Sequence, residues 1–351
     1  MPSRPMSPRQ RVLTAYRGGM PDKVPFAVWH TRLFPPDYPP LLEAEACIIV
    51  KSHVFDVAYE GIDIRTRRWD DAAGRHCRTT YRTPAGPLET LTCYANATSW
   101  TVERLFKGPE DYDALLALVA ARRFPAAYDR FAADDARFGP QGLARPAPMQ
   151  TPMFEIIHEL MGVETFSIEL TERPDAIDAL YQGLMTRRRE ALAVVAGSPA
   201  AYAVVEGNVA FEIIGPARFA RYHAPAITEA CELMASRGIL TGAHLDGNNA
   251  ALAPLVAQTG LDVIEAHTPP PDCDLSVADA RKAWPDKAIH LNFPSSLHHR
   301  PRQAILDAAR DILAEAAPGA GFVFGLTEDI PTNEHLPALA RLVRDVGATP
   351  M

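Results

Sequence analysis

Short apolar runs alternate with amphipathic segments along the chain from about residue 200 onward. The apolar runs cover residues 201–211, 238–247, 261–271, 287–296 and 320–331, and glycine, proline or asparagine bounds each of them. The segments between them repeat apolar residues with a helical period, as at Ile305, Ala309 and Ile312. Strands that alternate with helices predict repeated βα units around a parallel sheet.

Polar residues follow the apolar part of each run, which is where a barrel of parallel strands carries its active site. Nearly continuous apolar strands also occur in doubly wound sheets, but this placement of polar residues favours an α/β fold of the (β/α)8 TIM-barrel class. The stretch "VPFAVWH" (residues 24–30) has the same form and is expected to be the first barrel strand. We expect residues 1–351 to form a single domain of this kind.

Residues 62–103 have a different pattern, in which polar residues alternate with β-formers around Gly74 and the turn sequence "PAGP". This pattern predicts β-hairpins, which we expect to form an insertion over the barrel mouth. Residues 109–124 begin with acidic residues and carry several leucines, so a helix is expected there.

The composition argues against several classes of function. A formal net charge of −8 gives no basic footprint for nucleic acid or an anionic membrane, so a small-molecule substrate is expected. The five cysteines are widely spaced without a CxxC motif, which argues against a disulfide framework or a zinc ribbon. No segment has the pattern of a signal peptide or a membrane span, and the sequence predicts a soluble cytoplasmic protein.

Titratable or aromatic side chains gather where the predicted strands end. The groups are Trp29-His30, Glu206 with Asn208, His244 with Asp246, Glu265 with His267, and Thr327-Glu328-Asp329. In a strand, residues i and i+2 share a face, so His244 and Asp246 are expected to point at one spot. Glu328 is the best candidate for a third ligand. One histidine and two carboxylates with an open position suit Zn²⁺, Fe²⁺ or Mn²⁺.

Structural roles compete with each of these functional interpretations. A single histidine two residues before an aspartate is common, and the aspartate of such a pair often caps the following helix. Glu206 and Glu265 could each be a base, a ligand or half of a structural ion pair. Trp29 could pack in the core instead of contacting substrate. Cys273 is expected to be a small loop residue and not a ligand. The pair His298-His299 is expected to be solvated at the start of a helix.

Several stretches of the chain resemble the uroporphyrinogen decarboxylase superfamily, which includes the decarboxylase proper and methyltransferases that serve corrinoid proteins or thiol acceptors. The resemblance is carried by "RQRVLTAYRGGMPDKVPFAVW", "ELMGVETFSIELTERPDAIDAL" (159–180), "IIGPARFARYHAPAI", "GILTGAHLDGN" and "GLTEDIPTNEHLPALARLV". Together these stretches span most of the chain in the family's order. The resemblance implies a (β/α)8 barrel.

The resemblance to the methyltransferases also implies a metal site. Their zinc is held by a histidine and a cysteine two apart, and by a second cysteine just before a late Ile-Pro. Here those positions carry His244, Asp246 and Glu328, so both thiolates are replaced by carboxylates. Carboxylate oxygens are harder ligands than thiolates, so a site of this kind would accept Mn²⁺ or Fe²⁺ as well as zinc.

The resemblance to the decarboxylase proper is weaker at the substrate site. Its arginine-rich motif after the first strand appears here as "VWHTRLFPPDYPP", which keeps Trp29 and Arg32 but lacks the second arginine. A substrate with many carboxylates needs several basic partners, so a porphyrinogen is not the expected substrate.

The first functional hypothesis is a metal-dependent methyltransferase that demethylates a small O- or N-methylated compound and passes the methyl group to a corrinoid protein or a similar acceptor. Its metal ligands would be His244, Asp246 and Glu328. Glu206 or Glu265 would act as general base or complete the metal shell, and His267 would donate a proton. Trp29, His30, Arg32 and Asn208 are expected to contact the substrate.

Two other hypotheses remain open at this stage. The second is a carboxy-lyase, which would decarboxylate a small carboxylic acid in the same acidic pocket with or without a metal. The third is a carrier that binds a corrinoid or another tetrapyrrole, and it is the weakest because no DxHxxG-type signature is present.

Overall fold

The computed structural model describes residues 5–72, 74–95, 98–147, 150–209, 211–328 and 330–347. The chain divides into two compact units, whereas the sequence analysis treats it as one domain. The first unit combines residues 1–54, 127–149 and 195–351, and the second combines residues 55–126 and 150–194.

The first unit contains a sheet of eight parallel strands in the order β10-β11-β12-β13-β14-β1-β2-β9. The strands are β1 (Phe26–Trp29), β2 (Cys47–Ser52), β9 (Gly142–Pro146), β10 (Tyr202–Gly207), β11 (Leu240–His244), β12 (Val263–His267), β13 (Ala288–Asn292) and β14 (Phe322–Leu326). Because β9 lies beside β10, the sheet curls into a nearly closed barrel, which confirms the predicted fold class. The apolar runs of the sequence predict all of these strands except β2 and β9.

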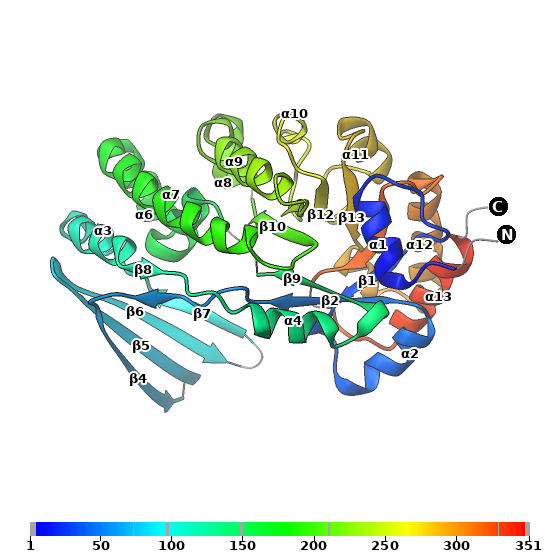
Figure 1. Cartoon of the computed structure of the whole chain (residues 1–351), viewed down its shortest axis with the longest axis horizontal. Coiled ribbons are helices and arrows are strands. Elements are labelled where there is room, and N and C mark those ends of the chain that lie inside the picture. Colours follow the sequence, from blue (N-terminus) through cyan, green and yellow to red (C-terminus); the bar gives the residue numbers. More distant parts are fainter. Residues whose placement is uncertain are drawn as a thin grey trace. The chain divides into compact units, whose positions relative to one another are not determined.

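Helices surround the sheet, and Figure 1 shows α9, α10 and α11 following one another along β10 to β13. The helices of this unit are α1 (Pro8–Tyr16), α2 (Tyr38–Glu43), α4 (Tyr128–Ala136), α8 (Phe211–Arg218), α9 (Ala224–Ala235), α10 (Ala253–Ala257), α11 (Val277–Ala283), α12 (Arg302–Ala316) and α13 (Leu336–Val346). In α12 the predicted apolar positions Ile305, Ala309 and Ile312 are buried, as their helical spacing requires.

Apolar side chains fill the barrel interior at the level where the strands begin. The cluster includes Ala27 of β1, Val263 of β12 and Val323 of β14, and helix α1 adds Val12 and Tyr16. Two residues beyond the cluster members of β2, β9, β12 and β13, the chain carries the polar residues Lys51, Arg145, Glu265 and His290. The site is therefore built on a packed core at the carboxyl ends of the strands, as is usual for this fold.

Two strands carry a one-residue irregularity near their carboxyl ends. The register of β10 against β11 shifts between Val204 and Glu206. The register of β12 against β13 shifts between Glu265 and His267, where Ala266 has a positive φ of 62°. Each bulge reverses the side of the sheet on which the following side chain lies.

The second unit contains the predicted hairpins as a four-stranded antiparallel sheet in the order β4-β5-β6-β7. Its elements are β3 (Ala58–Tyr59), β4 (Asp63–Asp71), β5 (Gly74–Thr83), β6 (Gly86–Ala95), β7 (Thr98–Glu103), α3 (Tyr112–Ala120), β8 (Arg122–Arg123), α5 (Pro152–Phe154), the π-helix η5 (Glu155–Met161), α6 (Val163–Glu172) and α7 (Pro174–Ala196). Helix α3 lies within the predicted helical segment 109–124. The place of these hairpins over the barrel mouth stays a prediction.

Among the helices of the described residues, none combines the length and the hydrophobicity of a membrane-spanning segment.

Candidate functional site

A buried imidazole lies at the centre of the candidate site. His244 is the last residue of β11, and its register partner on β12 is Glu265. The His244 Nδ1 lies 3.1 Å from Glu265 Oε2, and its Nε2 lies 3.3 Å from Asp246 Oδ2. Because an ionised carboxylate can only accept hydrogen bonds, Nδ1 carries a proton and donates it to Glu265. The second nitrogen, Nε2, points toward Asp246.

Arg145 completes this network from β9. Its Nε lies 3.1 Å from Glu265 Oε1, and neither side chain is exposed to solvent. Burying the Arg145 guanidinium or the Glu265 carboxylate without its partner would cost on the order of several kcal/mol. The two charges therefore depend on each other.

The network changes the protonation of its members. Burial favours the neutral carboxylic acid of Glu265, but Arg145 and His244 outweigh it and hold the pKa of Glu265 well below its ordinary value. Burial also opposes a charge on His244, but the hydrogen bonds with Asp246 and Glu265 outweigh it and raise the pKa of His244 to about 9. Without a bound cation, His244 is therefore protonated at neutral pH.

Glu328 follows β14 and lies close enough to Asp246 to be affected by its charge. Its Oε1 accepts a hydrogen bond of 2.6 Å from Asn292 Nδ2, and the Asn292 Oδ1 accepts one from the backbone N–H of Thr327. Burial raises the pKa of Glu328, and the negative charge of Asp246 raises it further. A carboxylic acid whose pKa is raised by burial and by a neighbouring carboxylate is typical of a site for a cation.

Trp29 forms a wall of the site together with basic side chains. Its ring centroid lies 5.2 Å from that of His244. The Lys51 Nζ lies 3.4 Å above the indole ring, and the Arg145 guanidinium carbon lies 4.9 Å from its centroid. Neither Lys51 nor Arg145 is among the residues predicted for the site. Lys51 follows the short apolar run "CIIV", which is the signal that could have identified it, whereas the residues around Arg145 carry no comparable signal.

The structure does not bring Glu206 to this cluster. After the bulge in β10, Glu206 pairs with Ala243, which lies on the outer side of the barrel wall, while His244 lies on the inner side. Its Oε2 is 3.0 Å from Nδ1 of His223, in the π-helix η6 (Phe219–His223). Glu206 therefore does not lie beside His244, as its predicted role of general base or metal ligand requires, because the bulge turns its side chain toward the surrounding helices.

His267 is displaced from the cluster in the same way. The bulge at Ala266 pairs His267 with Leu291, so its ring lies outside the barrel wall, 5.9 Å from the indole of Trp284. Burial lowers the pKa of His267 to about 4. Of the pair Glu265 and His267, only Glu265 therefore faces His244.

The remaining predicted substrate contacts are His30, Arg32 and Asn208. His30 and Arg32 belong to the short helix η1 (His30–Arg32), and the Arg32 guanidinium carbon lies 5.8 Å from the Trp29 ring centroid. Burial and the charge of Arg137 lower the pKa of His30. Asn208 is exposed, and its backbone N–H donates to the carbonyl oxygen of His244. Asp329 lies outside the described residues.

The predicted metal ligands fit a divalent ion in part. Two ligands in tetrahedral coordination, each about 2 Å from the ion, lie about 3.3 Å apart, and His244 Nε2 is 3.3 Å from Asp246 Oδ2. The third predicted ligand, Glu328, turns to Asn292 instead. Within the described ranges, no three histidine, cysteine or acidic side chains already surround one point. The donor types and the His–Asp spacing therefore fit, and a three-ligand site requires the Glu328 side chain to turn.

Two further sequence interpretations can be compared with the structure. The Cys273 thiol donates to the carbonyl oxygen of Asp246, and burial together with nearby carboxylates raises the pKa of this thiol to about 11. His298 is not solvated as predicted. It is buried beside His335 and packs edge-on against Phe293, because the short helix η7 (Ser295–His299) turns it inward.

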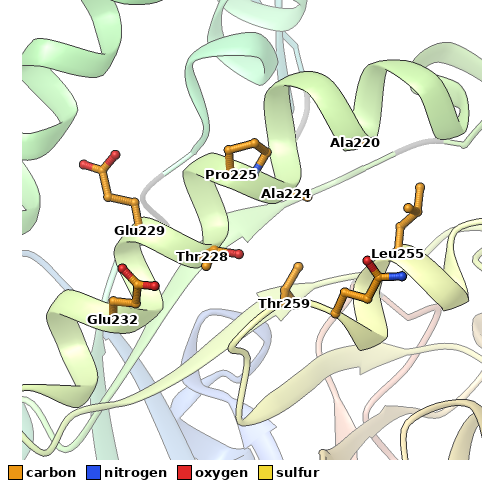
Figure 2. A pocket seen from close by; sticks show the side chains of 9 residues that line it. Ala220, Ala224, Pro225, Thr228, Glu229, Glu232, Leu255 and Thr259 are labelled. Atoms are coloured by element: carbon orange, nitrogen blue, oxygen red, sulfur yellow. The ribbon is translucent and has the colours of Figure 1, made fainter.

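A groove of about 570 Å³ lies elsewhere on this unit, on the outer helices. Figure 2 shows Pro225, Thr228, Glu229 and Glu232 along one helix, with Leu255 and Thr259 across from them. None of the residues that line it belongs to the cluster around His244.

A solved structure of a known protein shares this fold. A methyltransferase from Methanosarcina mazei superimposes with a TM-score of 0.59 at 12% identity, over 97% of this chain and 99% of that one. Dispersin B gives a TM-score of 0.33 at 11% identity, over 64% of this chain and 77% of that one. A mandelate racemase/muconate lactonizing enzyme from Roseiflexus sp. gives a TM-score of 0.26 at 10% identity, over 77% of this chain and 88% of that one. The last two scores are too low to support an argument.

Sequence comparison identifies the family. No curated protein matches the chain by sequence. The family model described as uroporphyrinogen decarboxylase (URO-D) matches residues 153–348, which include β10 to β14 with His244, Asp246, Glu265 and Glu328. This match covers more than half of the 351 residues. The chain therefore belongs to the uroporphyrinogen decarboxylase family.

Proposed function

We propose that the protein is a metal-dependent methyltransferase-like enzyme, which demethylates a small O- or N-methylated compound toward a corrinoid protein or a similar acceptor. The observation that carries this proposal is the position of His244 between the buried carboxylate of Glu265 and the outer carboxylate of Asp246. Membership of the uroporphyrinogen decarboxylase family and the fold shared with a methyltransferase support it.

Metal-binding histidines usually donate their second ring N–H to a carboxylate, which fixes the tautomer and makes the ligand more basic. Glu265 would have this role for His244, while His244 Nε2, Asp246 and Glu328 would hold the ion. Zinc suits these donors, and carboxylates also make Mn²⁺ or Fe²⁺ acceptable. When bound, the ion would supply Lewis-acid activation of the oxygen that leaves or attacks.

The other residues of the network would prepare this site. Arg145 neutralises Glu265, so that the carboxylate can stay ionised in the interior and keep His244 in one orientation. Trp29 covers one side of His244 and would keep water from the reacting atoms. The carboxylates of Asp246 and Glu328 supply the negative charge that attracts a cation. Glu206 and His267 have no part in this mechanism, because they lie outside the barrel wall.

The proposal is tested by the metal content of protein purified without chelator. We expect about one divalent ion per chain by elemental analysis, and a loss of most of it in the His244→Ala and Asp246→Ala variants. His299→Ala is the matched control, because His299 is exposed on the same unit. Equal metal content in His244→Ala and in the parent protein would refute the metal site.

The methyl transfer itself needs a separate assay. Free cob(I)alamin can stand in for the corrinoid acceptor, and its spectrum changes when a methyl group is transferred to cobalt. We expect turnover with at least one methoxylated or N-methylated small compound in the metal-loaded protein and none in His244→Ala. A metal-loaded protein that transfers no methyl group from a broad panel of such compounds would contradict the reaction class.

A second candidate function is a carboxy-lyase that acts on a small carboxylic acid without a metal. It is favoured by the raised pKa of His244, about 9, because a protonated imidazole could give its proton to the carbanion left by loss of CO₂. Release of CO₂ from candidate acids by chelator-treated protein, measured in the headspace, would favour this function over methyl transfer.

A further inference from the structure

We infer that Arg145, Lys51 and Trp29 form a subsite for a carboxylate, so that the substrate is a small methylated carboxylic acid. This inference rests on the proposed function, because it places the methylated end of that substrate near His244 and Asp246. The subsite lies on β1, β2 and β9, and the proposed metal ligands lie on or just after β11 and β14.

Two cations stand side by side on the inner wall. Lys51 of β2 and Arg145 of β9 are register partners in the parallel sheet. Like charges at neighbouring positions of a sheet destabilise it unless a counter-charge lies nearby. Glu265 is a counter-ion of Arg145, but its other oxygen binds His244. A monoanion bound at this wall would interact favourably with both cations.

Two buried donors on this wall have no acceptor among the described residues. The Arg145 Nη2 and the Trp29 Nε1 are shielded from solvent and make no hydrogen bond there. Arg145 is fully buried and Trp29 is 4% exposed. A buried N–H without an acceptor is costly and rare in folded proteins. The oxygens of a carboxylate could accept from both groups.

The distances around Trp29 limit the size of the ligand. The indole ring lies 3.4 Å from the Lys51 Nζ on the basic side and 5.2 Å, between centroids, from His244 on the acidic side. A molecule that spans both sides therefore needs only a few atoms between its carboxylate and its methylated heteroatom. Asp246 and Glu328 would repel a dianion, so a carboxylate suits this site better than a phosphate.

The test compares three small probes by isothermal titration calorimetry with chelator-treated protein. Methoxyacetate carries both groups, methoxyethanol lacks the carboxylate, and inorganic phosphate is a different anion. We expect methoxyacetate to bind at least about tenfold more tightly than either of the other probes. Lys51→Met should weaken methoxyacetate binding by about tenfold or more and leave methoxyethanol binding unchanged. Lys282→Met is the control, because Lys282 is exposed on helix α11.

Arg145 is tested together with Glu265, because Arg145→Met alone would remove one of the two cationic partners of this buried carboxylate. The double variant Arg145→Met, Glu265→Gln removes both charges and should also lose the preference for methoxyacetate over methoxyethanol. The inference is overturned if the parent protein binds acid and alcohol equally, if phosphate binds more tightly than methoxyacetate, or if Lys51→Met keeps the parent affinity. Since chelator is present throughout, these results do not depend on the metal site, whose failure is seen separately in metal content.

Discussion

Two buried glutamate–histidine pairs in the same barrel have nearly the same local geometry. Glu265 lies 3.1 Å from His244, and Glu206 lies 3.0 Å from His223. Both glutamates are fully buried and both lie at the carboxyl end of a strand. The first pair lies inside the barrel with Arg145 and Asp246. The second lies outside the wall under a π-helix, where His223 stacks on Phe219.

The difference comes from the position of one extra residue in each strand. In β10 the bulge precedes Glu206 and turns it outward, whereas in β12 the bulge follows Glu265 and leaves it facing inward. The same two residue types therefore form part of a candidate site in one strand and a structural contact in the other. A carboxylate at a strand end identifies a site only when the register of the strand is known.

The largest expected effect concerns Arg145, the cationic partner that only the inner pair has. Arg145→Met would leave the Glu265 carboxylate with one cationic partner instead of two, and we expect the free energy of unfolding to fall by about 3–5 kcal/mol. Urea unfolding followed by circular dichroism would measure it. Arg310→Met is the control, because its ion pair with Asp307 is exposed to solvent and should matter far less. If the two variants lost the same stability, the inner network would not depend on Arg145.

The two glutamates should differ in their effect on metal binding. Glu265→Gln removes the carboxylate that orients His244, and we expect the affinity for Zn²⁺ to fall by about 10- to 100-fold. Glu206→Gln makes the same chemical change outside the barrel wall and should leave the affinity nearly unchanged. Competition with a fluorescent zinc chelator would measure both. An equal loss in the two variants would remove the distinction between inner and outer pairs.

The histidines of the two sides should respond to pH in opposite directions. Burial on the outer side lowers the pKa of His267 to about 4. The contribution of this histidine to the free energy of unfolding is therefore present above the unfolded pKa of about 6.5, and it is lost as the pH falls toward 4. The pKa of His244 is raised to about 9 on the inner side, so its stabilisation is present below about 6.5 and is lost as the pH rises through 9.

The outer histidine allows a direct test. When the pH falls from neutral to about 5, His267 alone should lower the free energy of unfolding by about 2 kcal/mol, because its neutral form is favoured only in the folded state. The variant His267→Gln has no such group and should show a smaller loss over the same range in urea unfolding at each pH. A pH dependence identical to that of the parent protein would show that His267 is not kept neutral in the folded state.

The smallest expected effect concerns the bulge that separates Glu265 from His267. Ala266 is buried at φ 62°, where a side chain costs about 1–2 kcal/mol relative to glycine. Glycine is more flexible in the unfolded chain, so Ala266→Gly should change the free energy of unfolding by less than about 1 kcal/mol. A large loss in thermal or urea unfolding would show that the Ala266 methyl group, and not its backbone, holds the bulge.

Much of the fold could be predicted from the sequence because its signals are local. The apolar runs gave β1 and β10 to β14, and the helical period gave α9 and α12. Strands β2 and β9 were missed. The residues "GLARP" of β9 are too few and too mixed to read as a buried strand, and this strand is recognised only by its pairing with β2.

The candidate site was only partly predictable. His244, Asp246, Glu265 and Trp29 were found because they follow predicted strands. Arg145 and Lys51 were not, because they belong to the two missed strands. Glu206 and His267 were predicted as catalytic residues because they lie at predicted strand ends. A bulge turns each of them outward and leaves no mark in the residue pattern.

The sequence by itself determined a barrel of alternating strands and helices, with titratable side chains at the carboxyl ends of its strands. Those features depend on periodicity and on turn residues, which act over a few neighbours in the chain. Only the tertiary structure decided which of these side chains meet. The strand register turned Glu206 outward and kept Glu265 inward, and closure of the barrel brought Arg145 to Glu265 from 120 residues away. Such contacts depend on packing between distant segments, which no local pattern encodes.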